Sequence, residues 1–290
     1  MCVPAWAGST PDKAVDIGGD TALHYVDSGS GEPIVFVHGS LSDYDYWSDQ
    51  LSEFAKHGRA IAYSRRYNTP NINPPISGYS AVTDAHDMAA FIERLRLAPA
   101  HVVGHSYGAF AALILATERP ELVRTLTLAE PPAMSLLDHL PEPSTAAGKA
   151  MLRDVNMRMV KPMQVAFRGG RSEEGVRIFI DYVFGRAGTW DRMSPADKAD
   201  TMKEAREWQV MMTRGTLFPT VSPERVRKVD HSTLVLSGAR SYPFLGLIDQ
   251  ALMALLPNRR RIVFPTAGHQ MWYQEPQACR SAVLELIAGR

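Results

Sequence analysis

Short apolar runs, each long enough for one β-strand, recur along most of the chain. Pro33–His38 is a continuous apolar run of the kind found in strands buried on both faces, whereas Thr21–Asp27 alternates like a half-buried strand. The remaining strand candidates are Arg59–Ser64, Ala100–Gly104, Val123–Ala129, Thr233–Ser237 and Arg261–Phe264. These seven runs predict one sheet, with strands from both the first part and the last part of the chain.

Helical patterns separate these runs. In Ala81–Leu97, one stripe of apolar residues at helical spacing is formed by Val82, Ala85, Met88, Ala89, Ile92 and Leu95. Further helices are predicted at Tyr46–Lys56, Tyr107–Thr117, Leu245–Leu256 and Pro276–Ala288. Buried strands that alternate with helices are typical of an α/β fold, with a mostly parallel central sheet flanked by helices.

The alternation stops between Pro131 and Val229. This stretch lacks strand patterns and reads as helices near Ser144–Val165, Glu173–Phe184 and Pro195–Met212. We therefore expect residues 1–130 and 230–290 to form the α/β core and residues 131–229 to form a helical cap inserted after the sixth strand. Nine of the 13 methionines lie in the cap. They suit either a surface that repacks around varied apolar ligands or the soft core of a helical bundle.

Composition excludes several classes of protein. The 290 residues contain 31 Lys+Arg and 31 Asp+Glu, so no basic surplus favours a nucleic-acid partner. The start, Met1–Lys13, lacks the apolar core of a secretory signal, and no run approaches the roughly 20 apolar residues of a membrane span. We expect a cytoplasmic protein without a membrane partner; the oligomeric state stays open.

The segment Gly104-His105-Ser106-Tyr107-Gly108 lies between a predicted strand and a predicted helix. A Gly-x-Ser-x-Gly segment in this context is typical of a nucleophile elbow, whose sharp turn lifts the serine hydroxyl above the sheet edge. The motif alone also arises by chance. Ser106 is therefore a candidate nucleophile because of where the motif lies.

Two further segments supply what an acyl-transfer reaction needs. His38-Gly39-Ser40 ends a central strand, and a loop there can direct the Ser40 N–H toward an oxyanion, together with the N–H of Tyr107. Gly268-His269 follows the last strand, where a histidine can reach the serine hydroxyl as a general base. An ordinary turn and a histidine without catalytic function are the alternatives.

In this order the three segments resemble the α/β-hydrolase family, and the resemblance runs from about Asp16 to Gly289. It implies a Ser–His–acid triad. Where the family most often has its Asp, after the strand Thr233–Ser237, this chain has Ser241. Some members carry the acid at the end of the strand beside the elbow strand, which here is Glu130. Glu130 is thus the predicted acid of the triad. The alternatives are Asp249, which lies inside a predicted helix, and a purely structural role for Glu130.

The resemblance implies a serine hydrolase acting on a small apolar ester or lactone, without metal or cofactor. Because position 106 is Ser rather than Asp, epoxide opening and dehalogenation are not expected. The alternatives are carbon–carbon bond hydrolysis, perhydrolysis on the same triad, or non-catalytic binding of a small molecule. Arg65-Arg66-Tyr67, after the strand Arg59–Ser64, is open to an anion-binding or a structural role.

Overall fold

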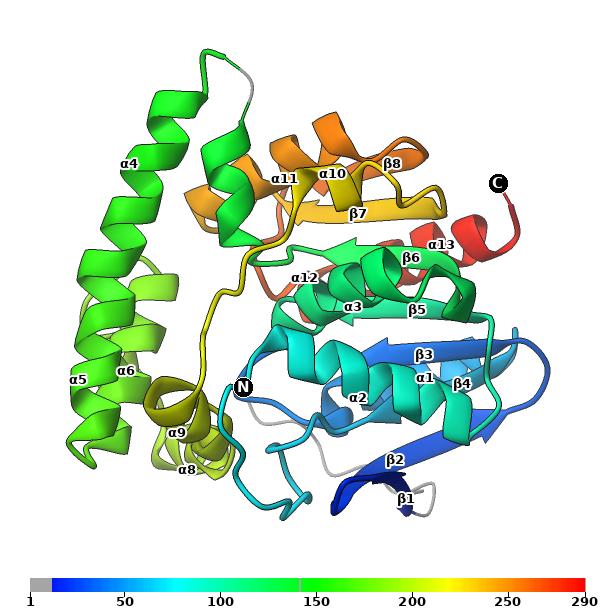
Figure 1. Cartoon of the computed structure of the whole chain (residues 1–290), viewed down its shortest axis with the longest axis horizontal. Coiled ribbons are helices and arrows are strands. Elements are labelled where there is room, and N and C mark those ends of the chain that lie inside the picture. The colour runs from blue at the N-terminus through cyan, green and yellow to red at the C-terminus, as the bar shows by residue number, and fades with distance from the viewer. Residues whose placement is uncertain (1–11, 141, 290) are drawn as a thin grey trace.

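The computed structural model describes residues 12–140 and 142–289, arranged around one central sheet (Figure 1). Residues 1–11, which include Cys2 and most of the segment Met1–Lys13, lie outside the described residues. The strands are β1 (Lys13–Gly18), β2 (Thr21–Gly29), β3 (Pro33–Val37), β4 (Arg59–Tyr63), β5 (Ala100–His105), β6 (Val123–Ala129), β7 (Ser232–Gly238) and β8 (Arg259–Phe264).

The eight strands lie in the order β1-β2-β4-β3-β5-β6-β7-β8. The pairs β1–β2 and β2–β4 are antiparallel, and every other pair is parallel. The prediction of a mostly parallel sheet is confirmed. Strand β1 was not predicted, because its residues are exposed or half-buried at the sheet edge and carry no apolar run.

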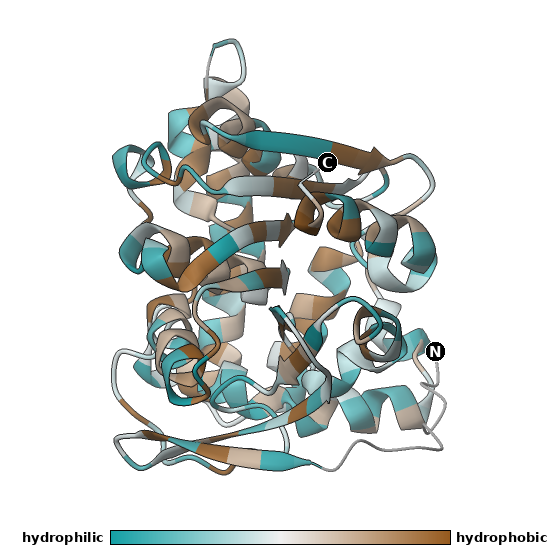
Figure 2. Cartoon of the chain, turned by 90° about the vertical axis from the view of Figure 1, so that its right-hand side faces the viewer, coloured by the Kyte–Doolittle hydropathy of each residue, from teal (hydrophilic) through white to brown (hydrophobic). Residues whose placement is uncertain are grey.

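Helices cover both faces of the sheet, which explains the continuous apolar character of its central strands. One face packs against α2 (Ala81–Arg94), α3 (Tyr107–Glu118) and α11 (Pro243–Leu255), and the other against α1 (Ser48–Phe54) and α13 (Pro276–Ile287). Figure 2 shows hydrophobic colouring on the strands in the middle and hydrophilic colouring on the outer turns of the helices. The single cysteine of the described residues, Cys279, is buried in this second layer.

The residues between β6 and β7 form a helical cap on the side to which the parallel strands point (Figure 1). Its helices are η3 (Met134–His139), α4 (Thr145–Val155), η4 (Asn156–Val160), α5 (Lys161–Arg168), α6 (Ser172–Val183), α7 (Thr189–Arg192), α8 (Pro195–Lys203), α9 (Ala205–Arg214) and α10 (Pro223–Val226). The short helices η1 (Tyr44–Trp47), η2 (Pro120–Leu122) and α12 (Met271–Gln274) complete the fold.

Two cap helices predicted as continuous are interrupted. The helix predicted at Ser144–Val165 contains the π-helical segment η4, so its hydrophobic stripe shifts between α4 and α5. The helix predicted at Pro195–Met212 breaks at Glu204, which is 4% exposed and points its carboxylate to Thr69 in the core. Hydrophobic periodicity in the sequence does not reveal a π-helical segment, nor does it reveal a buried glutamate that bonds to the core.

None of the described helices is long and apolar enough to cross a bilayer.

Candidate active site

The serine of the Gly-x-Ser-x-Gly segment occupies the tight turn between β5 and α3. Ser106 has φ 52° and ψ −123°, a strained conformation for a residue with a side chain. A Cβ on Gly104 would lie 2.5 Å from Ala109 Cα, and a Cβ on Gly108 would lie 2.4 Å from the His38 carbonyl oxygen. Both positions therefore require glycine, and together they allow helix α3 to pack tightly behind Ser106.

Glu130 follows the last residue of β6, the neighbour of the elbow strand. Its side chain is 1% exposed, and its backbone has φ 50°, so the chain turns sharply as it leaves the sheet. One carboxylate oxygen accepts the backbone N–H of Gly238 at 2.8 Å. The other lies 2.6 Å from Nδ1 of His269 and also accepts the hydroxyl of Ser241 at 2.7 Å. The buried carboxylate thus has three partners, and both of its oxygens are engaged.

His269 lies in the loop between β8 and α12, with a side chain 13% exposed. Its carbonyl oxygen is 2.9 Å from Nε2 of His105, and the two imidazole rings are 4.6 Å apart. Because a carbonyl can only accept, the proton of His105 must be on Nε2. Burial holds the pKa of His105 well below its ordinary value, so this histidine stays neutral and fixes the backbone that carries His269.

The structure brings Ser106, His269 and Glu130 to the same edge of the sheet. His105 neighbours Ser106 in the chain and contacts His269. In the described part of the chain, no hydrogen bond joins the Ser106 hydroxyl to His269. Catalytic hydrogen bonds are often long in enzymes without substrate and tighten in the complex.

The two predicted oxyanion donors belong to residues near Ser106: Tyr107 follows it in the chain, and Ser40 follows Gly39 in the loop after β3. A Cβ built on Gly39 would lie 2.9 Å from the Cβ of Ser106, so the loop after β3 closely approaches the serine. Among the described residues, the N–H groups of Ser40 and Tyr107 have no hydrogen-bond acceptor. Free backbone donors beside a strained serine are the arrangement that an oxyanion requires.

Asp249, the other acid near the end of the chain, lies elsewhere. It is fully buried in α11, and its Oδ2 accepts from the hydroxyl of Ser237 at 2.5 Å and from Arg261 at 3.3 Å. Burial raises the pKa of Asp249 to about 7. It does not contact His269, in line with the expectation that it lies too far along its helix.

Two aromatic side chains near the histidine were not predicted. The ring of Tyr242 lies 5.3 Å from that of His269, and Phe184, at the end of α6, contacts Tyr242 from the cap at 6.4 Å. Phe184 is 50% exposed although it is a large apolar residue. No sequence motif singles out either residue, because the contact joins the cap to the core across 58 residues of chain.

Arg65 and Arg66 are buried in ion pairs. Arg65 pairs with Asp84 and Glu207, and Arg66 pairs with Asp87. Their guanidinium groups are occupied by these carboxylates, which favours the structural role over anion binding at the rim. Among residues 12–140 and 142–289, no group of three or more His, Cys, Asp or Glu side chains is arranged to hold a metal ion.

Comparisons with known proteins agree with this architecture. The family model described as "Alpha/beta hydrolase family" matches residues 34–282. The "Putative non-heme bromoperoxidase BpoC" of Mycobacterium tuberculosis (strain CDC 1551 / Oshkosh) is 28% identical over 278 residues, covering 92% of this chain and 98% of that protein.

Two solved structures share the fold at lower identity. The carboxylesterase CesB of Bacillus subtilis superposes with a TM-score of 0.71 at 17% identity, over 98% of this chain and 94% of that one. The enol-lactonase of Burkholderia xenovorans LB400 superposes with a TM-score of 0.68 at 19% identity, over 96% and 100%. Because the family model spans most of the sequence, the chain belongs to the alpha/beta hydrolase family.

Proposed function

We propose that this protein is a serine hydrolase that cleaves a carboxylic ester or lactone through an acyl-enzyme on Ser106. The observation that carries the proposal is the 2.6 Å contact between Nδ1 of His269 and the buried carboxylate of Glu130. This contact fixes the proton of the neutral imidazole on Nδ1, so that Nε2 is free to take a proton from the serine.

In the first half of the reaction, Ser106 Oγ attacks the acyl carbonyl carbon while Nε2 of His269 takes the hydroxyl proton. The carbonyl oxygen becomes an oxyanion, which the N–H groups of Ser40 and Tyr107 stabilise. The tetrahedral intermediate then collapses. The bond from the acyl carbon to the leaving oxygen breaks, and the imidazolium of His269 protonates that oxygen as the alcohol departs.

In the second half, water attacks the acyl-enzyme and gives one proton to Nε2 of His269. Collapse releases the carboxylic acid and returns the proton to Ser106 Oγ. Throughout, Glu130 stabilises the imidazolium and holds its orientation, while Gly238 and Ser241 hold Glu130 in place.

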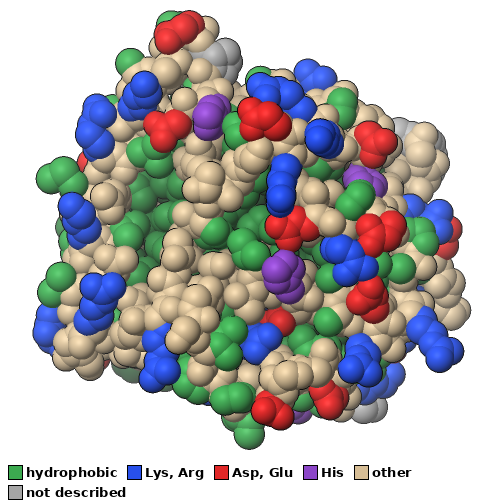
Figure 3. Space-filling view, viewed as in Figure 1, with side chains coloured by type: hydrophobic (Ala, Val, Ile, Leu, Met, Phe, Trp, Pro, Cys, Tyr) green, Lys and Arg blue, Asp and Glu red, His purple; other side chains and the backbone are tan. Residues whose placement is uncertain are grey.

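The surface on the cap side supports an apolar substrate. Figure 3 shows hydrophobic side chains gathered in a hollow between the α4–α5 side of the cap and the core, with Lys and Arg side chains on the outer surface around it. The parallel strands end toward this hollow (Figure 1), and the Tyr242–Phe184 contact extends from His269 into the cap. The two arginines nearest the β4 end are paired with buried acids.

Perhydrolysis is a second candidate, favoured by the similarity to the putative non-heme bromoperoxidase of Mycobacterium tuberculosis. In this reaction hydrogen peroxide replaces water at the acyl-enzyme, so the product is a peracid and Ser106 is regenerated unchanged. Hydrolysis and perhydrolysis are distinguished by adding hydrogen peroxide to an assay that uses an acetate ester as the acyl donor and by measuring the peracid formed. A peracid yield above that of the ester and peroxide alone would favour perhydrolysis.

The proposal is tested first by labelling with a fluorophosphonate, followed by intact-mass spectrometry. The wild type should gain one phosphonyl adduct and lose the ability to hydrolyse p-nitrophenyl butyrate, and Ser106→Ala should gain none. Absence of an adduct on the wild type at millimolar probe would contradict an activated serine and would favour the non-catalytic binding protein.

A further inference from the structure

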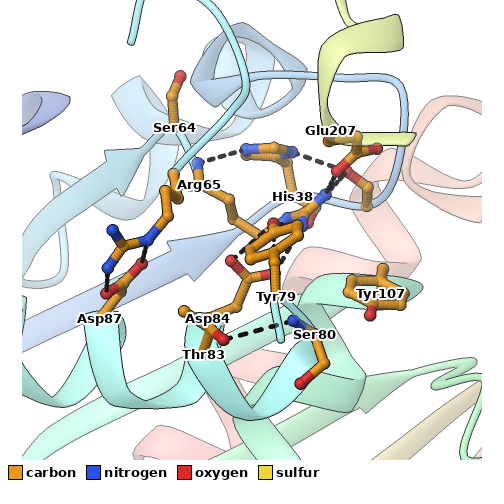
Figure 4. A network of polar contacts seen from close by, with 12 residues as sticks. His38, Ser64, Arg65, Tyr79, Ser80, Thr83, Asp84, Asp87, Tyr107 and Glu207 are labelled. Atoms are coloured by element: carbon orange, nitrogen blue, oxygen red, sulfur yellow. Dashed lines mark hydrogen bonds and ion pairs between the residues drawn. The ribbon is translucent and has the colours of Figure 1, made fainter. Parts of the chain in front are cut away.

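A buried ionic cluster around Arg65 lies beside His38, two residues before Ser40 in the chain (Figure 4). Arg65, two residues after the end of β4, is 1% exposed and pairs through Nη1 with Asp84 of α2 at 2.7 Å. Its Nη2 pairs with Glu207 of the cap helix α9, which is fully buried. Tyr79 donates its hydroxyl to Asp84 at 2.9 Å and completes the cluster.

The same cluster holds the oxyanion loop, residues 38–41, by its backbone. Arg65 donates to the carbonyl oxygens of His38 at 3.3 Å and Gly39 at 3.0 Å. Glu207 accepts the backbone N–H of Leu41 at 2.6 Å. The backbone groups on either side of the Ser40 N–H are therefore bound to charged partners. The Ser40 N–H itself has no acceptor within residues 12–140 and 142–289.

His38 contributes to the same arrangement. Its Nε2 accepts the backbone N–H of Arg65 at 2.9 Å, so the ring proton lies on Nδ1 and is donated to the Gly39 carbonyl at 2.7 Å. Burial and the nearby Arg65 charge hold the pKa of His38 well below its ordinary value, which keeps the ring neutral. The Gly39 carbonyl thus receives two donors.

Because the peptide bond is planar, the hydrogen bonds to the Gly39 carbonyl also set the direction of the Ser40 N–H. In a planar trans peptide, the C=O and the following N–H point in opposite directions. When the Gly39 carbonyl points to Arg65 and His38, the Ser40 N–H must point away from them. The close approach of Gly39 to the Cβ of Ser106 places that peptide beside the serine.

We infer that Glu207 and Arg65 are positioning residues that set the direction of the Ser40 N–H, so that a cap residue determines whether the oxyanion hole is formed. The inference rests on the proposed function, because it concerns the same oxyanion. Glu207 is the part supplied by the cap: its two oxygens bridge Arg65 and Leu41, which lie 24 residues apart in the core.

The decisive variant is Glu207→Gln. The two carboxylate oxygens accept from different donors, Leu41 and Arg65. In a glutamine the NH2 group takes the place of one of these oxygens and would face a donor there, so the side chain in the same position can accept from Arg65 or from Leu41 but not from both. The matched control is Glu204→Gln. Glu204 lies at the α8–α9 junction and binds Thr69 in the core without contacting the oxyanion loop. Both variants exchange a buried acid for its amide in the same part of the cap.

Two readouts are measured on both variants. The first is the steady-state rate of p-nitrophenyl butyrate hydrolysis per active site, with the active sites counted by fluorophosphonate titration. Inhibition by an aliphatic trifluoromethyl ketone is measured in the same assay. That inhibitor forms an oxyanion on Ser106. The second is the amide resonance of Ser40 in ¹⁵N-serine-labelled protein, which reports the loop without any turnover.

Glu207→Gln should shift the Ser40 resonance and lower kcat about 10-fold to 100-fold, with KM changed less than about threefold, since removing a whole oxyanion donor costs about 10²–10³. Affinity for the trifluoromethyl ketone should fall by the same factor as kcat. Glu204→Gln should leave the Ser40 resonance in place and kcat within about twofold of the wild type.

An unchanged Ser40 resonance in Glu207→Gln overturns the inference. So does a shifted resonance with unchanged kcat, or an equal loss in Glu204→Gln, which would indicate general loosening of the cap. If Glu207→Gln does not fold, Glu207→Asp takes its place, because it keeps both oxygens but withdraws them by one methylene. A wild type that resists fluorophosphonate contradicts the proposed function, while the Ser40 resonance still decides the positioning role.

Discussion

The hydroxyl of Ser241 donates to the carboxylate of Glu130 at 2.7 Å, on the oxygen that also faces Nδ1 of His269. The family resemblance implies an acid near position 241, where this chain has a serine. Ser241 is instead a hydrogen-bond donor to Glu130, which follows the end of the neighbouring strand β6. The arrangement lowers the cost of burying a charge by giving it three donors.

The first prediction concerns Glu130 itself. Glu130→Gln removes the charge that would stabilise the imidazolium, and its amide N–H would meet the N–H of His269 or Gly238. We expect kcat for p-nitrophenyl butyrate to fall about 10³–10⁴-fold, the scale found when a triad acid becomes its amide. Asp249→Asn is the matched control, since Asp249 is buried and does not contact His269. Equal losses in the two variants would contradict the assignment.

A second prediction uses Ser241 to move the acid. Ser241→Ala removes one of three donors to Glu130 and should lower kcat by no more than about 10-fold to 150-fold, because a hydrogen bond to a charged group contributes about 1.5–3 kcal/mol. Adding Ser241→Asp to the Glu130→Gln variant should restore part of the lost activity, since it returns a carboxylate to the side of Nδ1. No recovery in the double variant, with its fold intact by circular dichroism, would show that position 241 cannot reach the histidine.

The third prediction compares two glycines. A Cβ at Gly39 would lie 2.9 Å from Ser106 Cβ and 3.4 Å from Nδ1 of His105, so Gly39→Ala should displace the oxyanion loop and lower kcat about 10²-fold.

Gly246, inside α11, has open space around it. Gly246→Ala should raise the free energy of unfolding by about 0.5–1 kcal/mol and leave kcat unchanged. Urea denaturation and initial rates test both, and a Gly39→Ala enzyme as active as wild type would contradict the placement of the loop.

The fourth prediction concerns pH and stability. Burial raises the pKa of Glu204 to about 7 and also raises that of Asp43. Thr69 Oγ1 contacts both acids but has a single hydrogen, so one acid must supply a proton to the pair. A carboxyl whose folded pKa is raised binds more protons when folded than when unfolded. The free energy of unfolding should therefore fall as pH rises from about 4.5 to 7.

Glu204→Gln checks this dependence. The amide mimics the protonated acid, donating through its nitrogen and accepting through its oxygen. Chemical denaturation at pH 5 and pH 7.5 should show a smaller loss of stability in the variant than in the wild type, and a higher stability at pH 7.5. The same pH dependence in both proteins would place the proton elsewhere.

The elements of the core were predictable because their signals are local. The apolar runs of β3 and β5 and the Gly-x-Ser-x-Gly turn each reflect a constraint between residues close in the chain. Burial on both faces needs a continuous apolar run, and the approach of helix to strand behind Ser106 needs glycine at 104 and 108. The mostly parallel sheet followed from the alternation of such runs with helices.

The contacts of the candidate site were not visible in the same way. Glu130 and His269 are 139 residues apart, and Arg65 and Glu207 are 142 apart. A single sequence records which side chains are present but not which of them share a partner. Glu130, a prediction from strand order, lies where that order implies, whereas Glu207 carried no signal at all because a buried glutamate reads like any polar residue of a cap helix.

The sequence by itself determined the order of the strands from β2 to β8 and of the main core helices between them, the sharp turn at Ser106 and the family to which the chain belongs. Each of these depends on hydrophobic period or on residues adjacent in the chain. Only the tertiary structure decided which acid faces His269, that Ser241 supports it, and that Arg65 and a cap glutamate hold the oxyanion loop. Those contacts form when segments distant in the chain are buried together. A buried charge is stable only when partners from other segments lie within hydrogen-bonding distance of it.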